Sequence, residues 1–261
     1  MAGTLNTPAP VTTTELEDVV GGERLGAFGW RRLQAVAAVF TIAAFVVPMV
    51  IAGTLEGFLV AMAAPFVVGL VLSVFLPRVA AIFLGIVSLG TLASSAPYTA
   101  PTLAHPESVA DFIPQVFFAL STLTGAVAAI PAYREIRRGH VETRTPRLVT
   151  VAAAAVVVAA TIVSVVAATG IENVAALPGD ETILTRDFVF APAKLTADAG
   201  SVTIHVTNDD PTRHTFTIDG VTDLSVPPNT TQRVTFEAVP GTYRFYCIPH
   251  APDMDGVLVV E

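Results

Sequence analysis

The sequence holds 261 residues, of which 52% are apolar and only 14% are charged. Soluble proteins average roughly 45–50% apolar and about 25% charged residues, so this composition indicates that part of the chain crosses a membrane. The formal net charge is −8, and the few basic residues form no patch, which argues against a nucleic-acid partner. A single cysteine, Cys247, excludes an intramolecular disulfide.

Residues 1–32 contain proline, threonine and acidic side chains, a composition typical of disorder. This segment is long and acidic, and the apolar run after it exceeds the usual core of a cleaved signal peptide. We therefore expect residues 1–32 to remain on the protein as a disordered cytoplasmic tail.

The membrane domain is expected at residues 33–170. Five stretches without charged residues approach the roughly 20 residues that a helix needs to cross about 30 Å of hydrocarbon. They are 33–53, 58–76, 79–96, 112–132 and 148–170. This pattern predicts an all-α bundle of five transmembrane helices.

The arginine residues predict the orientation, because cytoplasmic loops of membrane proteins carry an excess of Lys and Arg. With the N-terminus inside, the arginines before the first span, Arg78 and the run 134–147 are all cytoplasmic. The outer connections near Glu56 and at 97–111 then hold neither Lys nor Arg. We expect a multi-pass protein of a prokaryotic plasma membrane, with a cytoplasmic N-terminus and an extracytoplasmic C-terminal domain.

The five predicted spans contain no Asp, Glu, Lys, Arg or His, and such residues usually mark ion or proton pathways. The bundle is therefore expected to be an anchor or a docking surface for a partner. A substrate path built from Gln115 and the polar run 88–95 is the alternative. His105 and His140 are expected in loops on opposite sides of the membrane, without acidic or histidine partners at metal-ligand spacing.

Residues 171–181 are expected to form a short linker to a second domain at residues 182–261. Short runs of alternating apolar and polar residues, broken by Gly, Pro, Asn and Asp, predict an all-β sandwich there. Val202, Ile204 and Val206 share one face of a predicted strand. His205 lies on the other face and is expected to be solvated.

One thiol, two imidazoles and one thioether are the informative groups of this domain. Cys247, His250 and Met254 fall on one tight loop, and His214 belongs to an earlier strand. Two His and one Cys with a weak axial Met form the ligand set of a blue-copper electron-transfer site. We therefore predict one type 1 copper ion per chain, bound by His214, Cys247, His250 and Met254.

Each of these residues also has a simpler interpretation, since a buried Cys or Met is often a core residue. An idle exposed thiol outside the cell would, however, be prone to oxidation, and the four residues together favour the metal. A binuclear copper centre would need a second cysteine. The sequence also shows neither a zinc set of four ligands nor an open site with a general base. We therefore expect no enzymatic turnover.

Residues 188–261 resemble the cupredoxins, the family of plastocyanin, amicyanin, pseudoazurin and azurin. The motifs that carry the resemblance are Asn208-x5-His214, Pro240-Gly-x-Tyr243 and Cys247-x2-His250-x3-Met254-x-Gly256. The resemblance implies a Greek-key sandwich in which His214, Cys247 and His250 are the strong ligands and Met254 is axial. It also implies that electrons pass through His250 at the solvent edge.

Two features depart from the family pattern. Three residues separate His250 from Met254, as in azurin, a spacing between those of amicyanin and plastocyanin. Thr215 stands where plastocyanins and azurins usually place an Asn that braces the loops. Both departures affect the assignment of Met254 more than that of the other three ligands.

We expect a membrane-anchored, extracytoplasmic copper protein that carries single electrons between redox partners. Ile248, Pro249, Ala251 and Pro252 would surround His250 with an apolar patch on which a redox partner, such as a cytochrome or an oxidase, docks. The charges of Asp253 and Asp255 favour a basic partner, because complementary charge speeds encounter. The alternatives are a copper-binding or metallochaperone module, and an accessory domain of a membrane permease or sensor.

Overall fold

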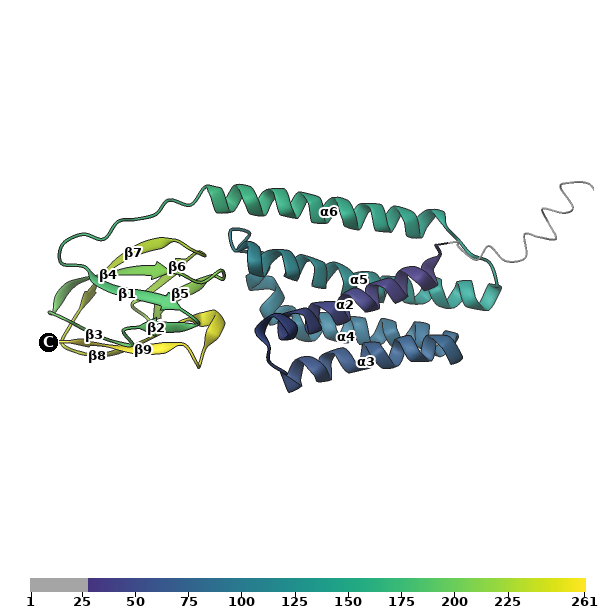
Figure 1. The fold of residues 1–261 in the computed structure, drawn as a ribbon, viewed down its shortest axis with the longest axis horizontal. Helices are drawn as coiled ribbons and strands as arrows, with labels where there is room; N and C mark the ends of the chain where they lie inside the picture. The colour runs from purple at the N-terminus through teal and green to yellow at the C-terminus, as the bar shows by residue number, and fades with distance from the viewer. Residues whose placement is uncertain (1–27) are drawn as a thin grey trace, which may run out of the picture.

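The computed structural model describes residues 28–261, and its two parts lie end to end (Figure 1). Most of the segment predicted as a disordered tail, residues 1–27, lies outside the described residues. A helical bundle is followed by a β-sandwich of two sheets, which confirms the predicted fold class. The C-terminus lies at the end of the sandwich that is far from the bundle (Figure 1).

Five helices of the described chain are long and apolar enough to cross a membrane. They are α2 (Trp30–Ala52), α3 (Gly57–Phe75), α4 (Pro77–Leu103), α5 (Val109–Arg138) and α6 (Arg144–Thr169). At 1.5 Å per residue, even the 19 residues of α3 extend about 28 Å, close to the thickness of the hydrocarbon core. The number of helices matches the prediction.

Several helices extend beyond the apolar runs from which they were predicted. Helix α4 continues through Pro97 and Pro101 to Leu103, so the connection expected at 97–111 is reduced to residues 104–108. Helix α2 begins at Trp30, inside the predicted tail. Hydropathy marks only the part of a helix that faces hydrocarbon, whereas the ends reach into the polar interface, where charge is tolerated.

Polar side chains inside the bundle hydrogen-bond from helix to helix. Gln34 Nε2 donates to the carbonyls of Ala81 (2.8 Å) and Gly125 (3.2 Å), which joins α2 to α4 and α5. Gln115 of the alternative substrate path donates to Thr99 Oγ1 at 2.7 Å. These polar groups satisfy one another's hydrogen-bonding capacity inside the bundle, because hydrocarbon offers no other partners.

The sandwich consists of nine strands and one short 3₁₀ turn. The strands are β1 (Glu181–Arg186), β2 (Val189–Ala191), β3 (Lys194–Ala197), β4 (Gly200–Asn208), β5 (His214–Ile218), β6 (Thr222–Val226), β7 (Thr231–Ala238), β8 (Gly241–Tyr246) and β9 (Asp255–Val260), with η1 at Ile248–His250. One sheet has the order β2-β1-β4-β7 and the other β3-β9-β8-β5-β6.

Side chains from both sheets fill one hydrophobic core. It includes Ile204 of β4, Phe216 of β5, Phe245 of β8 and Leu258 of β9, none of which is exposed to solvent. Val202 and Val206 point into this core together with Ile204, as the alternation predicts. At the β7–β8 corner, Tyr243 donates from its hydroxyl to the carbonyl of Val239 at 3.0 Å, which fixes the turn between the two strands.

The prediction that His205 is solvated is wrong. His205 is only 7% exposed, and its Nε2 lies 2.8 Å from the carbonyl oxygen of Val174. The predicted linker runs along this sheet, where Val174 N donates to Thr231 O and Thr231 N donates to Asn173. Residues outside the strand therefore cover the face that alternation assigns to solvent.

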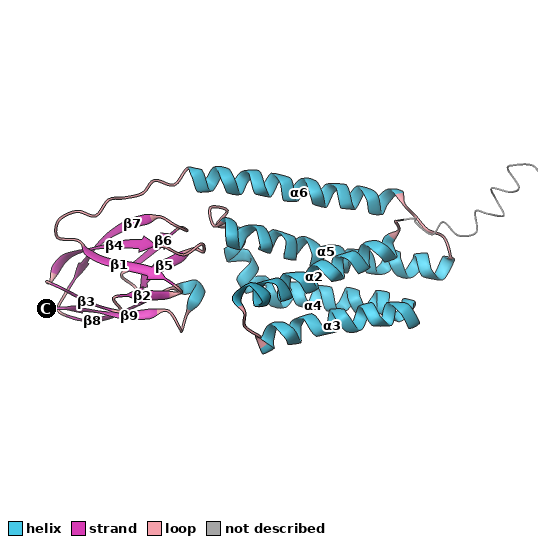
Figure 2. Ribbon diagram, in the orientation of Figure 1, coloured by secondary structure: helices cyan, strands magenta, loops and turns pink. Residues whose placement is uncertain are grey.

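The metal-ligand loops lie at the end of the sandwich that faces the bundle. In Figure 2 the short helical turn η1 is the part of the sandwich directed toward the ends of the helices. This arrangement decides which residues of the membrane half can reach the site.

Candidate metal centre

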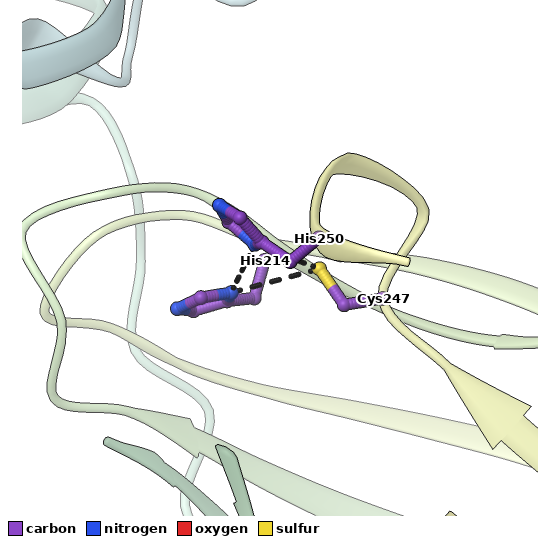
Figure 3. A group of neighbouring side chains, drawn as sticks. All are labelled: His214, Cys247 and His250. Atoms are coloured by element: carbon purple, nitrogen blue, oxygen red, sulfur yellow. Dashed lines mark hydrogen bonds between the residues drawn. The ribbon is translucent and has the colours of Figure 1, made fainter. Parts of the chain in front are cut away.

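Three of the four predicted ligands converge on one point (Figure 3). Nδ1 of His214, at the start of β5, lies 3.1 Å from Nδ1 of His250 and 3.6 Å from Sγ of Cys247. Sγ of Cys247, just after β8, lies 3.3 Å from Nδ1 of His250. Bonds of about 2.0–2.3 Å allow two ligands of one ion to be at most about 4.6 Å apart, so the three atoms fit a single ion.

Burial disfavours the charged forms of the three side chains. Cys247 and His214 are fully buried and His250 is half-buried. Burial raises the pKa of the Cys247 thiol and lowers the pKa of His214. Burial, followed by the charge of His214, lowers the pKa of His250 to about 4. Neutral imidazoles are ready to bind a cation, whereas the thiol must release its proton when the metal enters.

A residue that the sequence analysis missed orients His214. Oδ2 of Asp210 lies 2.8 Å from Nε2 of His214, on the side of the ring opposite Cys247. A carboxylate at this place accepts the Nε2 proton, so the lone pair of the ring stays on Nδ1, where it faces the metal position. The signal in the sequence was an acidic residue four positions before the histidine, within Asn208-Asp209-Asp210.

Asp210 also shapes the turn between β1 and β2. Asp187 and Phe188 have φ values of 55° and 61°, which costs non-glycine residues about 1–2 kcal/mol each. Their backbone N–H groups donate to the two oxygens of Asp210 at 2.8 and 3.3 Å. The same carboxylate therefore holds the turn and the first histidine.

The turn places Phe188 against both histidine rings. Its ring centroid lies 4.9 Å from that of His250 and 5.8 Å from that of His214, edge to face in each case. Phe188 remains 46% exposed, so it shields one side of the rings and contributes apolar surface beside the site. Sequence analysis took it only as the start of the resembling segment.

Asn208, the first residue of the upstream motif, ties the loop before His214 to the neighbouring strands. Its Nδ2 donates to the carbonyls of Thr212 (2.9 Å), Val226 (3.0 Å) and Pro227 (3.0 Å). Its Oδ1 accepts from Asp210 N at 2.9 Å. This buried amide fixes the loop that presents Asp210 and His214.

Thr215 braces the two ligand loops. Its backbone N–H donates to Sγ of Cys247 at 3.3 Å. Its Oγ1 accepts from the backbone N–H of Ile248 at 2.9 Å. The first bond stabilises negative charge on the sulfur, and the second connects β5 to the loop after Cys247.

Met254 closes that loop through its backbone. Its N–H donates to the carbonyl of His250 at 3.2 Å, and its carbonyl accepts from Cys247 N at 3.0 Å. The side chain is 1% exposed and belongs to the core cluster that also contains Cys247. This placement agrees with both interpretations of Met254, as axial ligand and as core residue.

Gly256 is required by close packing beneath the loop. A Cβ at this position would meet the ring of Phe245 and, at 2.5 Å, the carbonyl oxygen of Ala193. Atoms of a backbone and a buried ring have no room to move, so any side chain here would displace β9 and with it the ligand loop.

The outer rim of the site is apolar, as expected. Ile248 is 51% exposed, and Pro249, Ala251 and Pro252 are exposed around His250. The negative charge predicted beside this rim is smaller than expected, because Arg244 Nε pairs with Asp255 Oδ2 at 2.9 Å. Asp253 remains exposed.

The other histidines do not join the site. His105 does have an acidic partner, against expectation, because Glu107 Oε1 lies 2.8 Å from its Nδ1 within the short α4–α5 connection. Within residues 28–261, one group of three or more His, Cys, Asp or Glu side chains is close enough together to hold a metal ion. It consists of His214, Cys247 and His250.

The comparisons with known proteins concern the C-terminal part of the chain. A family model described as a cupredoxin-like domain matches residues 152–260, and none of the curated proteins matches the chain. A reduced variant of amicyanin is similar at 22% identity, with a TM-score of 0.29, over 33% of this chain and 86% of that chain. Amicyanin from Paracoccus versutus is similar at 16% identity, with a TM-score of 0.29, over 33% and 85% of the two chains.

Proposed function

We propose that the protein is a membrane-anchored electron carrier, because residues 152–260 match the family model of a cupredoxin-like domain. In this proposal His214, Cys247 and His250 bind one type 1 copper ion, with Met254 as axial ligand. The observation that carries it is the convergence of one thiol and two imidazole nitrogens within 4.8 Å of one another.

Copper, when bound, supplies a one-electron couple between Cu(II) and Cu(I). The protein has to hold the ligands in nearly the same place in both states, because rearrangement slows electron transfer. Asp210 fixes the ring of His214, and Thr215 links the two loops. Cys247 is held by its backbone N–H bond to Met254. The ligands therefore stand on a frame that is rigid before the metal binds.

His250 is the route by which electrons enter and leave. It is half-buried, whereas Cys247 and His214 are fully buried. The exposed apolar residues around it, with Phe188 added, form a surface on which a redox partner such as a cytochrome or an oxidase can dock. Apolar surface excludes water at the contact and leaves the histidine edge as the shortest path between the two centres.

The five helices anchor this domain at the membrane, and the arginine distribution supports an extracytoplasmic position for it. Reporter fusions in the α4–α5 connection, after Gly139 and at the C-terminus should indicate outside, inside and outside. The first fusion belongs at residues 104–106, because α4 continues through Pro101. A cytoplasmic C-terminus would contradict both the orientation and the proposed exchange of electrons at the outer face.

The alternative of a metallochaperone is less favoured by the site. A chaperone passes its metal to another protein and needs ligands that the acceptor can reach. Here Cys247 and His214 are fully buried, and only His250 is accessible. An electron carrier needs the opposite, a metal that is retained and that has one exposed ligand edge. It needs no substrate site, so we propose no enzymatic turnover.

The test is a titration of the purified, metal-free, full-length protein with Cu(II). The expected result is one copper per chain and an intense blue colour from the thiolate-to-copper transition, which reversible reduction bleaches without loss of the metal. Cys247→Ser is the control and should bind copper without this colour. A colourless wild-type complex, or release of copper on reduction, would contradict the proposal.

A further inference from the structure

A side chain of the membrane half reaches the ligand loops of the sandwich. Asp111 lies in the first turn of α5. Helix α5 begins at the end of the bundle that faces the sandwich (Figure 1). Its Oδ2 accepts a hydrogen bond from the backbone N–H of Arg213 at 3.2 Å. Arg213 immediately precedes His214, so this contact ends one residue from a proposed copper ligand.

The bundle holds Asp111 in place. Ser108, which is almost completely buried, donates from its hydroxyl to the same oxygen of Asp111, and Asp111 N donates to Ser108 O at 3.0 Å. A carboxylate in the first turn of a helix is also stabilised by the helix dipole. The side chain is therefore a fixed part of the bundle when it meets Arg213.

The charge of Asp111 lies close to the site, because its carboxylate bonds to the backbone of the residue next to His214. Cu(II) carries one more positive charge than Cu(I), so a fixed negative charge nearby favours the oxidised state. Interactions in the partly buried space between the two halves are less screened by salt than those on an open surface.

We propose that the membrane half does more than anchor the copper domain: Asp111 docks the ligand loops on the bundle, and its charge lowers the reduction potential of the copper centre. The electrostatic half of this inference rests on the proposed function. The docking half concerns the protein alone and can be tested without metal.

Docking is tested by amide hydrogen exchange on the metal-free, full-length protein in lipid nanodiscs. The Arg213 amide should be protected in the wild type and exchange about tenfold faster or more in Asp111→Ala, the amount expected for a hydrogen bond to a charged group. Glu107→Gln is the matched control, because Glu107 bonds to His105 within the same connection. It should leave the Arg213 amide unchanged.

The electrostatic effect is tested by redox titration of the copper-loaded proteins in the same nanodiscs. Asp111→Asn keeps an oxygen acceptor for Arg213 and removes the charge, so its potential should shift to a more positive value. The shift should exceed that of Glu107→Gln, which removes a charge from the same connection.

Two results would overturn the inference. An Arg213 amide that exchanges equally fast in the wild type and in Asp111→Ala would rule out docking. Equal potentials in Asp111→Asn and Glu107→Gln would rule out the specific effect of charge. If the protein formed no coloured copper centre, the proposed function would fail, whereas the exchange experiment would still decide whether Asp111 docks the loops.

Discussion

Oδ2 of Asp210 lies 2.8 Å from Nε2 of His214, and the two oxygens of this carboxylate also accept the backbone N–H groups of Asp187 and Phe188. One acidic side chain thus connects the ligand to the turn that carries the aromatic ring beside it. A carboxylate that accepts the second ring N–H of a metal-binding histidine fixes the tautomer and the orientation of the ring.

Asp210→Asn should therefore weaken copper binding by roughly 10- to 100-fold, the usual cost of losing such a partner. Three N–H groups now share the two carboxylate oxygens of Asp210, whereas Asn offers one acceptor oxygen. Either the ring of His214 or the turn at Phe188 therefore loses its hydrogen-bond acceptor. The measurement is a competition titration with a copper chelator. Asp209→Asn is the control, because Asp209 pairs with exposed Arg186. Equal loss of affinity in both variants would contradict an orienting role.

The role of Met254 is decided by two variants measured together. Cys247→Ser should abolish the blue colour, because the thiolate supplies the strongly coloured bond. Met254→Gln should keep a coloured, copper-loaded protein with a lower reduction potential, because a harder oxygen ligand favours Cu(II). An unchanged potential in Met254→Gln would show that Met254 is a core residue and leave a three-ligand site.

Thr215→Val tests the brace between the two loops. The variant keeps the shape of the side chain but removes the acceptor of Ile248 N–H, a loss of about 1 kcal/mol for one hydrogen bond. The Ile248 amide should then exchange roughly fivefold faster in the metal-free protein. Thr212→Val is the matched control, since Thr212 Oγ1 is buried without a hydrogen-bond partner within the described residues. It should be neutral or stabilising, and similar exchange in both variants would exclude the brace.

The ion pair of Asp180 and Arg233 predicts a pH dependence of the sandwich. Arg233 donates from Nε and Nη2 to the two oxygens of Asp180, each at 2.8 Å. These bonds lower the pKa of Asp180 to about 2, below its value of about 3.9 in an unfolded chain. The folded state therefore gains stability above about pH 4 and loses it as the pH falls toward about 2.

The contribution of the ion pair to stability is measured by urea unfolding of the metal-free protein, with the amide exchange of β7 as the signal. The unfolding midpoint of the wild type should fall between pH 4 and pH 2 by more than that of Asp180→Asn, whose side chain does not titrate. Parallel curves for the two proteins would show that the ion pair adds no stability.

Local patterns in the sequence were sufficient for the two halves of the fold. Charge-free runs of about 20 residues predict helices in hydrocarbon, and alternation with a period of two predicts strands. Both are short-range properties, so the five helices and the core face of β4 were predicted correctly. The ends of the helices were not, because the polar interface permits helix in residues that hydropathy scores as loop.

Other errors came from contacts between distant segments. His205 was assigned to solvent because alternation describes only one strand, whereas the linker residue Val174 covers it. Phe188 was not recognised as part of the site, since its contact with His250 depends on a turn with positive φ that the distant carboxylate of Asp210 holds.

By itself, the sequence determined that a chain rich in apolar residues carries a single thiol with histidine and methionine on one loop. Cys247, His250 and Met254 fall within eight consecutive residues, so the sequence alone places them on one loop. The tertiary structure brings the predicted ligand His214 to Cys247 and His250. Only this structure shows that Asp210 bonds to Nε2 of His214 and that Asp111 of α5 reaches the same loops. Asp111 and Arg213 are 102 positions apart, and no pattern of short period can report a contact that exists only after both halves have folded.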